Sequence, residues 1–314
     1  MENLMVIGGA TASGKSAVAV ALARKIGGEV ISCDSMQLYR GMDIGTATPT
    51  IEEMAGVQHH LLNVSDPAMD HLSAPEYREM ALKVISQVKA RGNIPILCGG
   101  TGLYIDALTK PRGFSVKGDD ALRAELLKLD KQALHEKLAS IDSAAAARLN
   151  VNDTRRVIRA LEVFFLSGKT LTEHIQADAG RPGDYEGLLF ALNWPRETLY
   201  ARIDARVDEM MAAGLLDEVR FLRASGVPRD ATAMQAIGYK ELLAHLAGEE
   251  PLEMAVNRIK QSTRRYAKRQ LTWFRGDSRT HWLDACEQSV DKIVEEIQMI
   301  WKKREEACKF SCPK

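Results

Sequence analysis

A short glycine-rich stretch near the N-terminus has the residue types and spacing of a phosphate-binding loop. It follows the pattern G-x-x-x-x-G-K-[ST], between an apolar run at residues 4–7 and a helix-forming run at residues 17–23. In that context, backbone N–H groups and the N-terminus of the helix attract phosphate oxygens. Lys15 would neutralise the terminal phosphate, and the Ser16 hydroxyl would ligate Mg²⁺. We therefore predict a polyphosphate site made of Gly9, Ala10, Thr11, Ala12, Ser13, Gly14, Lys15 and Ser16.

Two further polar side chains follow strands that we expect beside this loop. Asp34 comes directly after an apolar run at residues 29–33, and Thr101 lies in a Gly-Gly-Thr-Gly turn after the run at residues 94–98. Because ligands bind at the carboxyl ends of strands in an open parallel sheet, Asp34 and Thr101 are predicted at the same edge as Lys15. Position alone leaves two interpretations of Asp34, a functional carboxylate or the cap of a helix or turn.

The segment 258–279 concentrates positive charge in a chain whose net charge is zero. On a helix, Arg264 and Lys268 share one stripe, and Arg265 and Arg269 share an adjacent one, with aromatic residues interleaved. Basic stripes with planar side chains suit a nucleic-acid backbone and unstacked bases. The alternative is a salt-bridged surface helix, which would need acidic partners, and this segment contains a single aspartate. The pattern therefore favours nucleic acid.

Composition is that of a globular protein, long enough for one large domain or two ordinary ones. The five cysteines include no C-x-x-C pair and no signal peptide is evident, which predicts a reducing, cytoplasmic location. Cys308 and Cys312 could be half of a zinc site, but an exposed tail is favoured because no other half is present. No apolar run approaches a membrane span, so we expect no membrane partner.

The order of the apolar and helical patterns predicts an α/β fold. We expect a P-loop-type parallel sheet flanked by helices, formed by residues 1–111 and 187–314, with an all-helical domain inserted at residues 112–186. One helix of the insert carries Arg155, Arg156 and Arg159, which a solvated basic helix would also explain. Arg206 lies in a helical region at residues 196–224, where it could reach a phosphate or form a surface ion pair.

Taken together, these stretches resemble the tRNA dimethylallyltransferases, also called tRNA isopentenyltransferases. The resemblance extends over almost the whole chain and is far more specific than the phosphate loop, which many kinases share. It is carried by residues 9–16, 34–39, 41–47, 59–61, 99–104, 152–153, 156–162, 235–241 and 263–270, with Trp273 and Arg275. Asn63 stands where many relatives carry an aspartate, and Lys110-Pro111 replaces a more apolar stretch. The lack of a C-terminal zinc-finger extension favours a bacterial-type enzyme.

The resemblance implies a reaction. A dimethylallyl group moves from dimethylallyl diphosphate to the exocyclic amino nitrogen of the adenine next to the anticodon, on its 3′ side. The loop, Lys15 and Mg²⁺ would stabilise the departing diphosphate. Asp34 would accept the amino proton, because a free aspartate has a pKa of about 3.9 and is ionised at neutral pH. Thr101 would hold the base, which must be flipped out of the anticodon loop.

The resemblance also implies the residues that contact substrates, with the tRNA anticodon stem-loop as the partner of a monomeric enzyme. Arg206 joins the diphosphate site. The implied tRNA contacts are Asp34, Ser35, Met36, Gln37, Thr101, Arg123, Arg155, Arg156, Arg159, Arg264, Arg265, Lys268, Arg269 and Gln270. Three alternatives share parts of this pattern: a small-molecule kinase, a prenyltransferase acting on free adenine nucleotides, and a non-catalytic RNA-binding protein switched by nucleotide.

Overall fold

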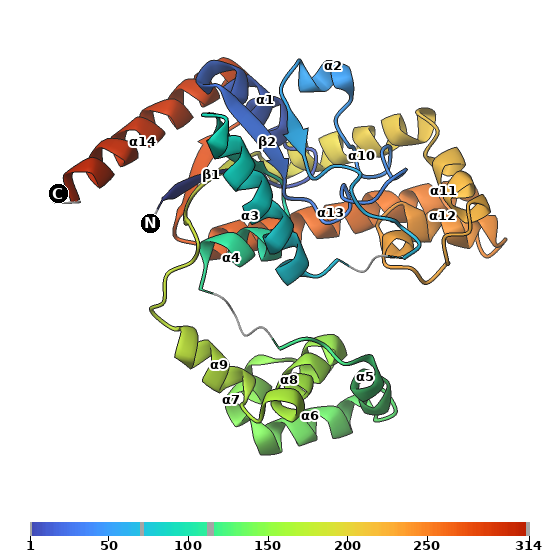
Figure 1. The fold of residues 1–314 in the computed structure, drawn as a ribbon. Helices are drawn as coiled ribbons and strands as arrows, with labels where there is room; N and C mark the ends of the chain where they lie inside the picture. The colour runs from blue at the N-terminus through green and yellow to red at the C-terminus, as the bar shows by residue number, and fades with distance from the viewer. Residues whose placement is uncertain (1, 70–71, 112–115, 312–314) are drawn as a thin grey trace. The chain divides into compact units, whose positions relative to one another are not determined.

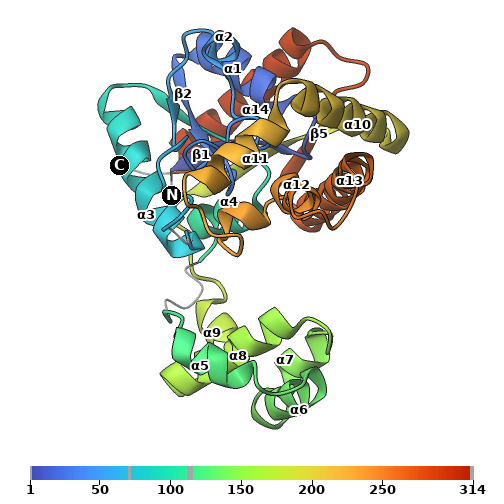
Figure 2. The same cartoon turned by 90° about the vertical axis from the view of Figure 1, so that its right-hand side faces the viewer.

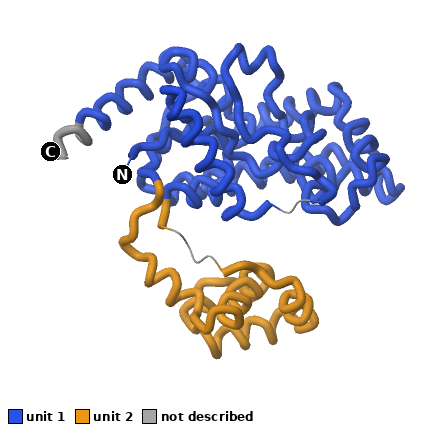
Figure 3. Tube along the Cα trace, in the orientation of Figure 1, with its two compact units in different colours: residues 1–109, 185–314 blue, residues 110–184 orange. Residues whose placement is uncertain are grey.

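The chain forms two compact units. The computed structural model describes residues 2–69, 72–111 and 116–311, without the side chains of residues 307–311. One unit comprises Met1–Thr109 and Tyr185–Lys314, and the other comprises Lys110–Asp184 (Figure 3). The sequence placed the boundaries of the insert at residues 112 and 186. Gly113, which the sequence marks as part of the linker, and Cys312 lie outside the described residues, as does the side chain of Cys308.

A six-stranded parallel sheet forms the centre of the larger unit, which confirms the predicted fold class. Its strand order is β3-β2-β4-β1-β5-β6. Figure 1 labels β1 and β2 of this sheet. The strands are β1 (Asn3–Gly9), β2 (Gly28–Ser32), β3 (His59–His60), β4 (Ile94–Cys98), β5 (Glu186–Asn193) and β6 (Thr280–Asp284). The inner strands are continuous apolar runs, the pattern of strands buried on both faces. Met5 pairs with Ile96 on one side and with Leu188 on the other, so the carboxyl ends of these strands share one edge.

Helices cover both faces of the sheet. On one face, α1 (Lys15–Ile26) and α14 (Val290–Ser311) bring Leu22 and Ile297 against Met5 and Phe190. On the other face lie α3 (Ala74–Ala90) and α4 (Gly102–Thr109), whose tyrosines, Tyr77 and Tyr104, stack with ring centroids 3.8 Å apart. The two layers enclose the apolar strands and leave their carboxyl ends accessible.

A further group of helices lies beside the carboxyl edge of the sheet. It consists of α10 (Arg196–Ala212), α11 (Leu215–Ala224), the 3₁₀ turn η1 (Ala233–Gln235), α12 (Tyr239–Leu246) and α13 (Leu252–Gly276). The short helix α2 (Ile51–Met54) lies between β2 and β3 in the chain. Helices α10 and α13 lie side by side in both views (Figures 1 and 2). Their shared core includes Val207, Leu215, Tyr239 and Ile259. The sequence predicted one helical region over residues 196–224, but Gly214 adopts a left-handed φ of +100° and separates two helices.

The smaller unit is entirely helical in its described residues. It contains α5 (Asp120–Leu126), α6 (Lys131–Ile141), α7 (Ser143–Arg148), α8 (Thr154–Ser167) and α9 (Leu171–Asp178). Leucines from α6 and α8, Leu138 and Leu161, are fully buried in its core. Asp130 and Asp142 cap α6 and α7 by accepting backbone N–H groups, which sets where these helices begin. No helix in the described part of the chain is long and apolar enough to cross a membrane.

Candidate active site

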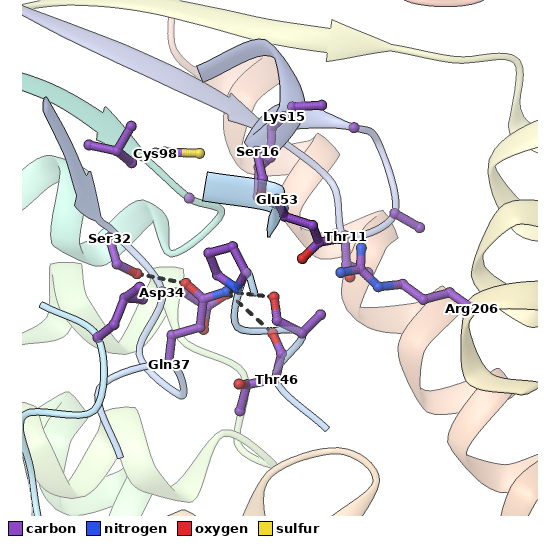
Figure 4. Close-up of a pocket in the computed structure, with 18 of the residues that line it drawn as sticks. Thr11, Lys15, Ser16, Ser32, Asp34, Gln37, Thr46, Glu53, Cys98 and Arg206 are labelled. Atoms are coloured by element: carbon purple, nitrogen blue, oxygen red, sulfur yellow. Dashed lines mark hydrogen bonds between the residues drawn. The ribbon is translucent and has the colours of Figure 1, made fainter. Parts of the chain in front are cut away.

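A cavity of about 460 Å³ opens at the carboxyl edge of the sheet. The loop after β1, the ends of β2 and β4, the segment before α2 and one face of α10 contribute to its lining. Figure 4 shows Lys15, Ser16, Asp34 and Arg206 around it. The predicted site residues that line the cavity are Thr11, Ala12, Gly14, Lys15, Ser16, Asp34, Gln37 and Arg206. Gly9, Ala10, Ser13, Ser35, Met36 and Thr101 are described residues outside that lining.

Two side chains hold the phosphate-binding loop through its backbone carbonyls. Arg202 Nε donates to the Ala12 carbonyl at 2.9 Å, and Trp194 Nε1 donates to the Ser13 carbonyl at 2.9 Å. The Arg202 guanidinium lies 4.4 Å from the centroid of the Trp194 ring. Because these contacts bind loop carbonyls, they leave the loop oriented to present N–H groups to an anion. The sequence did not assign a role to Trp194, although its position directly after β5 placed it at the same edge.

Lys15 begins α1 and reaches back across the loop. Its Nζ donates to the Ala10 carbonyl at 3.3 Å. Burial lowers the pKa of the Lys15 ammonium, and Cys98 and the Asp34 carboxylate act in the opposite direction. The ammonium and the Asp34 carboxylate are thus electrostatically coupled inside one cavity. Burial also raises the pKa of Cys98 to about 11, so that thiol is a protonated wall of the cavity.

Asp34 forms a turn cap and also lines the cavity. Its Oδ1 accepts the Met36 N–H at 2.9 Å, which is an aspartate-capped turn. Its side chain also lines the cavity beside the phosphate-binding loop. Thr101 adjoins this turn, because its Oγ1 accepts the Ser35 N–H at 3.2 Å. The carboxylate and the threonine hydroxyl therefore belong to one hydrogen-bonded segment.

Gln37 fixes the wall of the cavity opposite the loop. Its Oε1 accepts the Ser32 hydroxyl at 2.8 Å, and its Nε2 donates to the Ala47 carbonyl at 3.1 Å (Figure 4). The two adjacent histidines separate as expected for a strand: His59 lines the cavity, whereas His60 Nε2 lies 2.5 Å from Glu29. Burial lowers the pKa of His59, so its neutral form is favoured.

The structure explains why an asparagine suits position 63. The backbone of Asn63 adopts a φ of +53°, a region that asparagine tolerates better than most residues. Its Nδ2 donates to Asp43 Oδ1 at 2.7 Å. An aspartate in this place would put two carboxylates together, so the amide suits this chain.

Arg206 faces the cavity from α10. Burial lowers the pKa of its guanidinium, and the carboxylates of Glu53, Glu209 and Asp34 oppose that shift. Arg206 is half-buried and lines the cavity, so it lies where it could reach a phosphate and not only at the surface. With Lys15 and Arg202, it gives the cavity three cationic side chains.

The residues at the loop fit a magnesium ion that is brought in with a phosphate. Ser16 lines the cavity with Asp34, and both supply the oxygen ligands that Mg²⁺ prefers. In the described part of the chain, no group of three or more histidine, cysteine, aspartate or glutamate residues is arranged to hold a metal by itself. Mg²⁺ is commonly bound without such a cluster, through one or two protein oxygens and the phosphates of the substrate.

Helix α13 contains the basic stripes that the sequence identified, but acidic partners for one stripe come from another helix. Arg264 Nη1 donates to both carboxylate oxygens of Asp204 on α10, at 2.6 and 2.7 Å. Lys260 forms an ion pair with Asp208, also on α10, at 2.7 Å. Both aspartates lie far from residues 258–279 in the chain, so these pairs could not be predicted from that segment alone. Three basic side chains of α13 remain exposed. They are Arg265 and Arg269 of the adjacent stripe, and Lys268.

The structure corrects the assignment of Gln270 as an RNA contact, because this residue is only 4% exposed. Its Oε1 accepts the Thr11 N–H at 2.9 Å, and its Nε2 donates to the Gly100 carbonyl at 3.1 Å. Both halves of the amide are therefore used to join the phosphate-binding loop to the turn that carries Thr101. Gln270 positions the site instead of presenting a surface to RNA.

The four arginines of the helical unit that the sequence singled out fall into two groups. Arg155 and Arg156 are exposed on α8. Arg123 and Arg159 instead converge on Glu162, whose side chain is completely buried. Arg123 Nε lies 2.9 Å from Glu162 Oε1. Burial acts to raise the pKa of Glu162, but Arg159, the Asp119 N–H and Arg123 together hold it below its ordinary value.

The parallel sheet and the loop after β1 define a P-loop-type α/β protein. A family model described as IPP transferase matches residues 37–277. The tRNA dimethylallyltransferase of Geobacter metallireducens is 48% identical over 289 residues, 90% of this chain and 92% of that protein. That of Halalkalibacterium halodurans is 45% identical over 301 residues, 94% of this chain and 95% of that protein.

Solved structures agree with these matches. The crystal structure of the full-length tRNA isopentenylpyrophosphate transferase of Bacillus halodurans is 42% identical, with a TM-score of 0.74 over 99% of each chain. A eukaryotic dimethylallyltransferase acting on tRNA is 30% identical, with a TM-score of 0.79 over 91% of this chain and 75% of that chain. The chain belongs to the tRNA dimethylallyltransferase family, as its motifs predicted.

Proposed function

We propose that the protein transfers a dimethylallyl group from dimethylallyl diphosphate to the exocyclic amino nitrogen of the adenine on the 3′ side of a tRNA anticodon. The observation that carries this proposal is one cavity lined by both the Lys15 ammonium and the Asp34 carboxylate. A cationic loop and a proton acceptor at one site suit the transfer of a group from a diphosphate to a nitrogen that must lose a proton.

Lys15, Arg206 and the N–H groups of the loop would bind the diphosphate. As the allylic carbon–oxygen bond breaks, its electron pair leaves with the diphosphate, and these groups stabilise the growing negative charge. Mg²⁺ held at Ser16 and the phosphate oxygens would supply further charge neutralisation. The contacts of Arg202 and Trp194 with the loop carbonyls keep the loop in the orientation that this step needs.

Asp34 would take the proton that the adenine nitrogen loses. The nitrogen's electron pair forms the new carbon–nitrogen bond while one of its protons moves to the Asp34 carboxylate and then to solvent. Asp34 Oδ1 is oriented by the Met36 N–H, and Thr101 adjoins the same turn, where it would hold the base. The adenine reaches this site by leaving the anticodon stack, which costs a few kcal/mol and is repaid by contacts elsewhere on the RNA.

The contacts that offset base flipping would come from two basic surfaces. One is the exposed stripe of α13, with Arg265, Lys268 and Arg269. The other is α8 of the helical unit, with Arg155 and Arg156 exposed. Arg123, Arg159 and Arg264 already form ion pairs with carboxylates. They would therefore act on RNA through electrostatics at a distance and not through direct contacts.

We also propose a monomeric enzyme of the bacterial cytoplasm. Cys33 and Cys98 are buried free thiols, as expected in a reducing compartment.

The decisive experiment is a mass measurement. The protein is mixed with Mg²⁺, dimethylallyl diphosphate and an unmodified tRNA with adenine beside the anticodon, and the digested nucleosides are analysed. We expect a five-carbon unit on that adenosine alone and free diphosphate in equal amount. Transfer to free AMP would instead indicate a nucleotide prenyltransferase, release of ADP from ATP would indicate a kinase, and bound but unmodified tRNA would indicate a non-catalytic protein.

A further inference from the structure

One wall of the cavity is irregular backbone whose shape needs an explanation. Thr46, Ala47 and Pro49 line the cavity, and they belong to the connection between β2 and α2. Ala47 adopts a φ of +51°, which is unfavourable for a residue with a β-carbon. A strained segment of this kind keeps its shape only when surrounding contacts over-determine it.

A single carboxylate, Glu218 of α11, supplies those contacts. Its Oε2 accepts the N–H groups of Asp43 and Ile44, each at 2.8 Å, and its Oε1 accepts the Gly45 N–H at 3.1 Å. The Tyr239 hydroxyl donates to the same Oε1 at 2.5 Å. Four donors therefore occupy the carboxylate, whose charge strengthens every one of these hydrogen bonds.

Tyr239 also shapes the segment sterically. It is completely buried, and a β-carbon added to Gly45 would lie 2.5 Å from its ring. Burial, and then Glu218, raise the pKa of the Tyr239 hydroxyl well above its ordinary value, so it remains a donor. Tyr239 belongs to the segment 235–241, which carried part of the family resemblance but has no place in the proposed chemistry.

Short hydrogen-bonded steps connect Glu218 to the cavity. The Ala47 N–H donates to the Ile44 carbonyl at 3.1 Å, and the Thr48 N–H donates to the Asp43 carbonyl at 2.9 Å. The Ala47 carbonyl in turn accepts from Gln37 Nε2, on the segment that begins at Asp34 (Figure 4). A displacement of residues 43–45 would therefore move both Ala47 and Gln37.

We propose that Glu218 and Tyr239 are positioning residues that hold the Thr46–Ala47 wall of the cavity in the shape that receives dimethylallyl diphosphate. Neither residue lines the cavity. They act through the three N–H groups of residues 43–45. The kinetic part of this inference rests on the proposed function, whereas the structural part does not.

The test uses Glu218→Gln, which keeps the shape of the side chain but replaces one acceptor oxygen with an NH₂ donor that faces N–H groups. The matched control is Asp217→Asn, the neighbouring residue on α11, which forms only an exposed pair with Arg220 at 2.8 Å. Hydrogen exchange of the amides of residues 43–45 is followed by mass spectrometry, which needs no activity. We expect exchange about ten-fold faster in the Glu218 variant, equivalent to a loss of about 1.4 kcal/mol in local opening, and wild-type exchange in the control.

The kinetic arm measures transfer to tRNA. We expect the KM for dimethylallyl diphosphate to rise about ten-fold in Glu218→Gln, with the Kd for tRNA within two-fold of wild type. Tyr239→Phe keeps the ring against Gly45 and removes one donor, so it should give a smaller rise and serves as the second variant if the first does not fold. Faster exchange with unchanged KM would overturn the proposal, as would a fall in kcat alone or wild-type exchange. If wild-type protein shows no transfer at all, the proposed function fails, and the exchange result still stands by itself.

Discussion

At the scale of single residues, Asp34 combines a structural and a chemical position. One carboxylate oxygen accepts the Met36 N–H, and the side chain also faces the cavity that Lys15 lines. A turn aspartate is usually replaceable by asparagine, because the amide oxygen can accept the same hydrogen bond. A proton acceptor is not replaceable in this way. The two roles can therefore be separated by a single substitution.

We predict that Asp34→Asn retains tRNA binding and loses most turnover. The amide can keep the bond to the Met36 N–H but cannot take a proton, and general-base contributions are typically about 100- to 10,000-fold. Single-turnover transfer and filter binding with the same tRNA measure the two quantities. Asp34→Ala should lose turnover to a similar extent. Equal losses of binding and turnover in Asp34→Asn would contradict the role of proton acceptor.

Gln270 gives the second prediction at this scale. Gln270→Ala removes the acceptor of the Thr11 N–H and the donor to the Gly100 carbonyl, so a buried N–H loses its partner at a cost of about 1–3 kcal/mol. Because Thr11 lies in the phosphate-binding loop, we expect the KM for dimethylallyl diphosphate to rise about ten-fold or more. The Kd for tRNA, measured by titration, should stay within two-fold. A variant that loses tRNA affinity alone would restore Gln270 as an RNA contact.

At the scale of elements, helix α13 has three different sides. Its buried face carries Gln270 and Phe274, and another side forms ion pairs with α10 through Arg264. Its exposed stripe carries Arg265 and Arg269, and the Arg269 guanidinium lies 5.5 Å from the ring of Tyr266. One helix therefore connects a solvent-facing basic stripe with the loop that binds phosphate.

We predict that Arg265→Ala combined with Arg269→Ala weakens tRNA binding and flattens its dependence on salt. Each arginine that neutralises a phosphate releases a counterion, so losing two should reduce the slope of log K against log salt by about two. Binding is measured over a range of salt concentrations. Arg258→Ala, on the same helix but paired with Glu250, is the control and should leave the slope unchanged. An unaltered slope in the double variant would exclude this stripe as the RNA contact.

The elements also show what the sequence could and could not predict. Apolar runs identified β1, β2 and β4, because a strand buried on both faces leaves a continuous signal. The sequence analysis missed helix α9, although Thr170 and Glu173 form a capping box at its start. None of its residues is buried, so it has no apolar face to produce a helical period of hydrophobic residues. Contacts between distant segments, such as Arg264 with Asp204, leave no local trace. For the same reason the sequence placed Gln270 on the RNA side of its helix.

At the scale of the whole molecule, each of the two units depends on a buried carboxylate held by arginine. In the larger unit Glu29 accepts from Arg91, and this hydrogen bond lowers the pKa of Glu29 to about 2. In the helical unit Glu162 is held by Arg123 and Arg159 and also accepts the Asp119 N–H at 2.7 Å. Because every residue that lines the cavity belongs to the larger unit, the helical unit can be perturbed without touching the site of transfer.

The last prediction uses that separation. Glu162→Gln leaves two guanidinium groups without their shared countercharge, and breaking a buried pair of this kind costs about 3 kcal/mol. The pKa of Glu162 is lowered in the folded chain, so its contribution is complete above pH 4.5 and is lost as the pH falls through the folded pKa. The acid decline in stability of the helical unit, followed by hydrogen exchange, should therefore be shallower in the variant than in wild type. Glu125→Gln, which alters only an exposed pair with Lys128, is the control.

At neutral pH the Glu162→Gln variant should bind tRNA several-fold more weakly, because α8 carries the exposed Arg155 and Arg156. Its affinity for dimethylallyl diphosphate should stay within two-fold of wild type. Equal loss of both affinities, or no loss of tRNA affinity from a loosened helical unit, would contradict its role in holding the RNA.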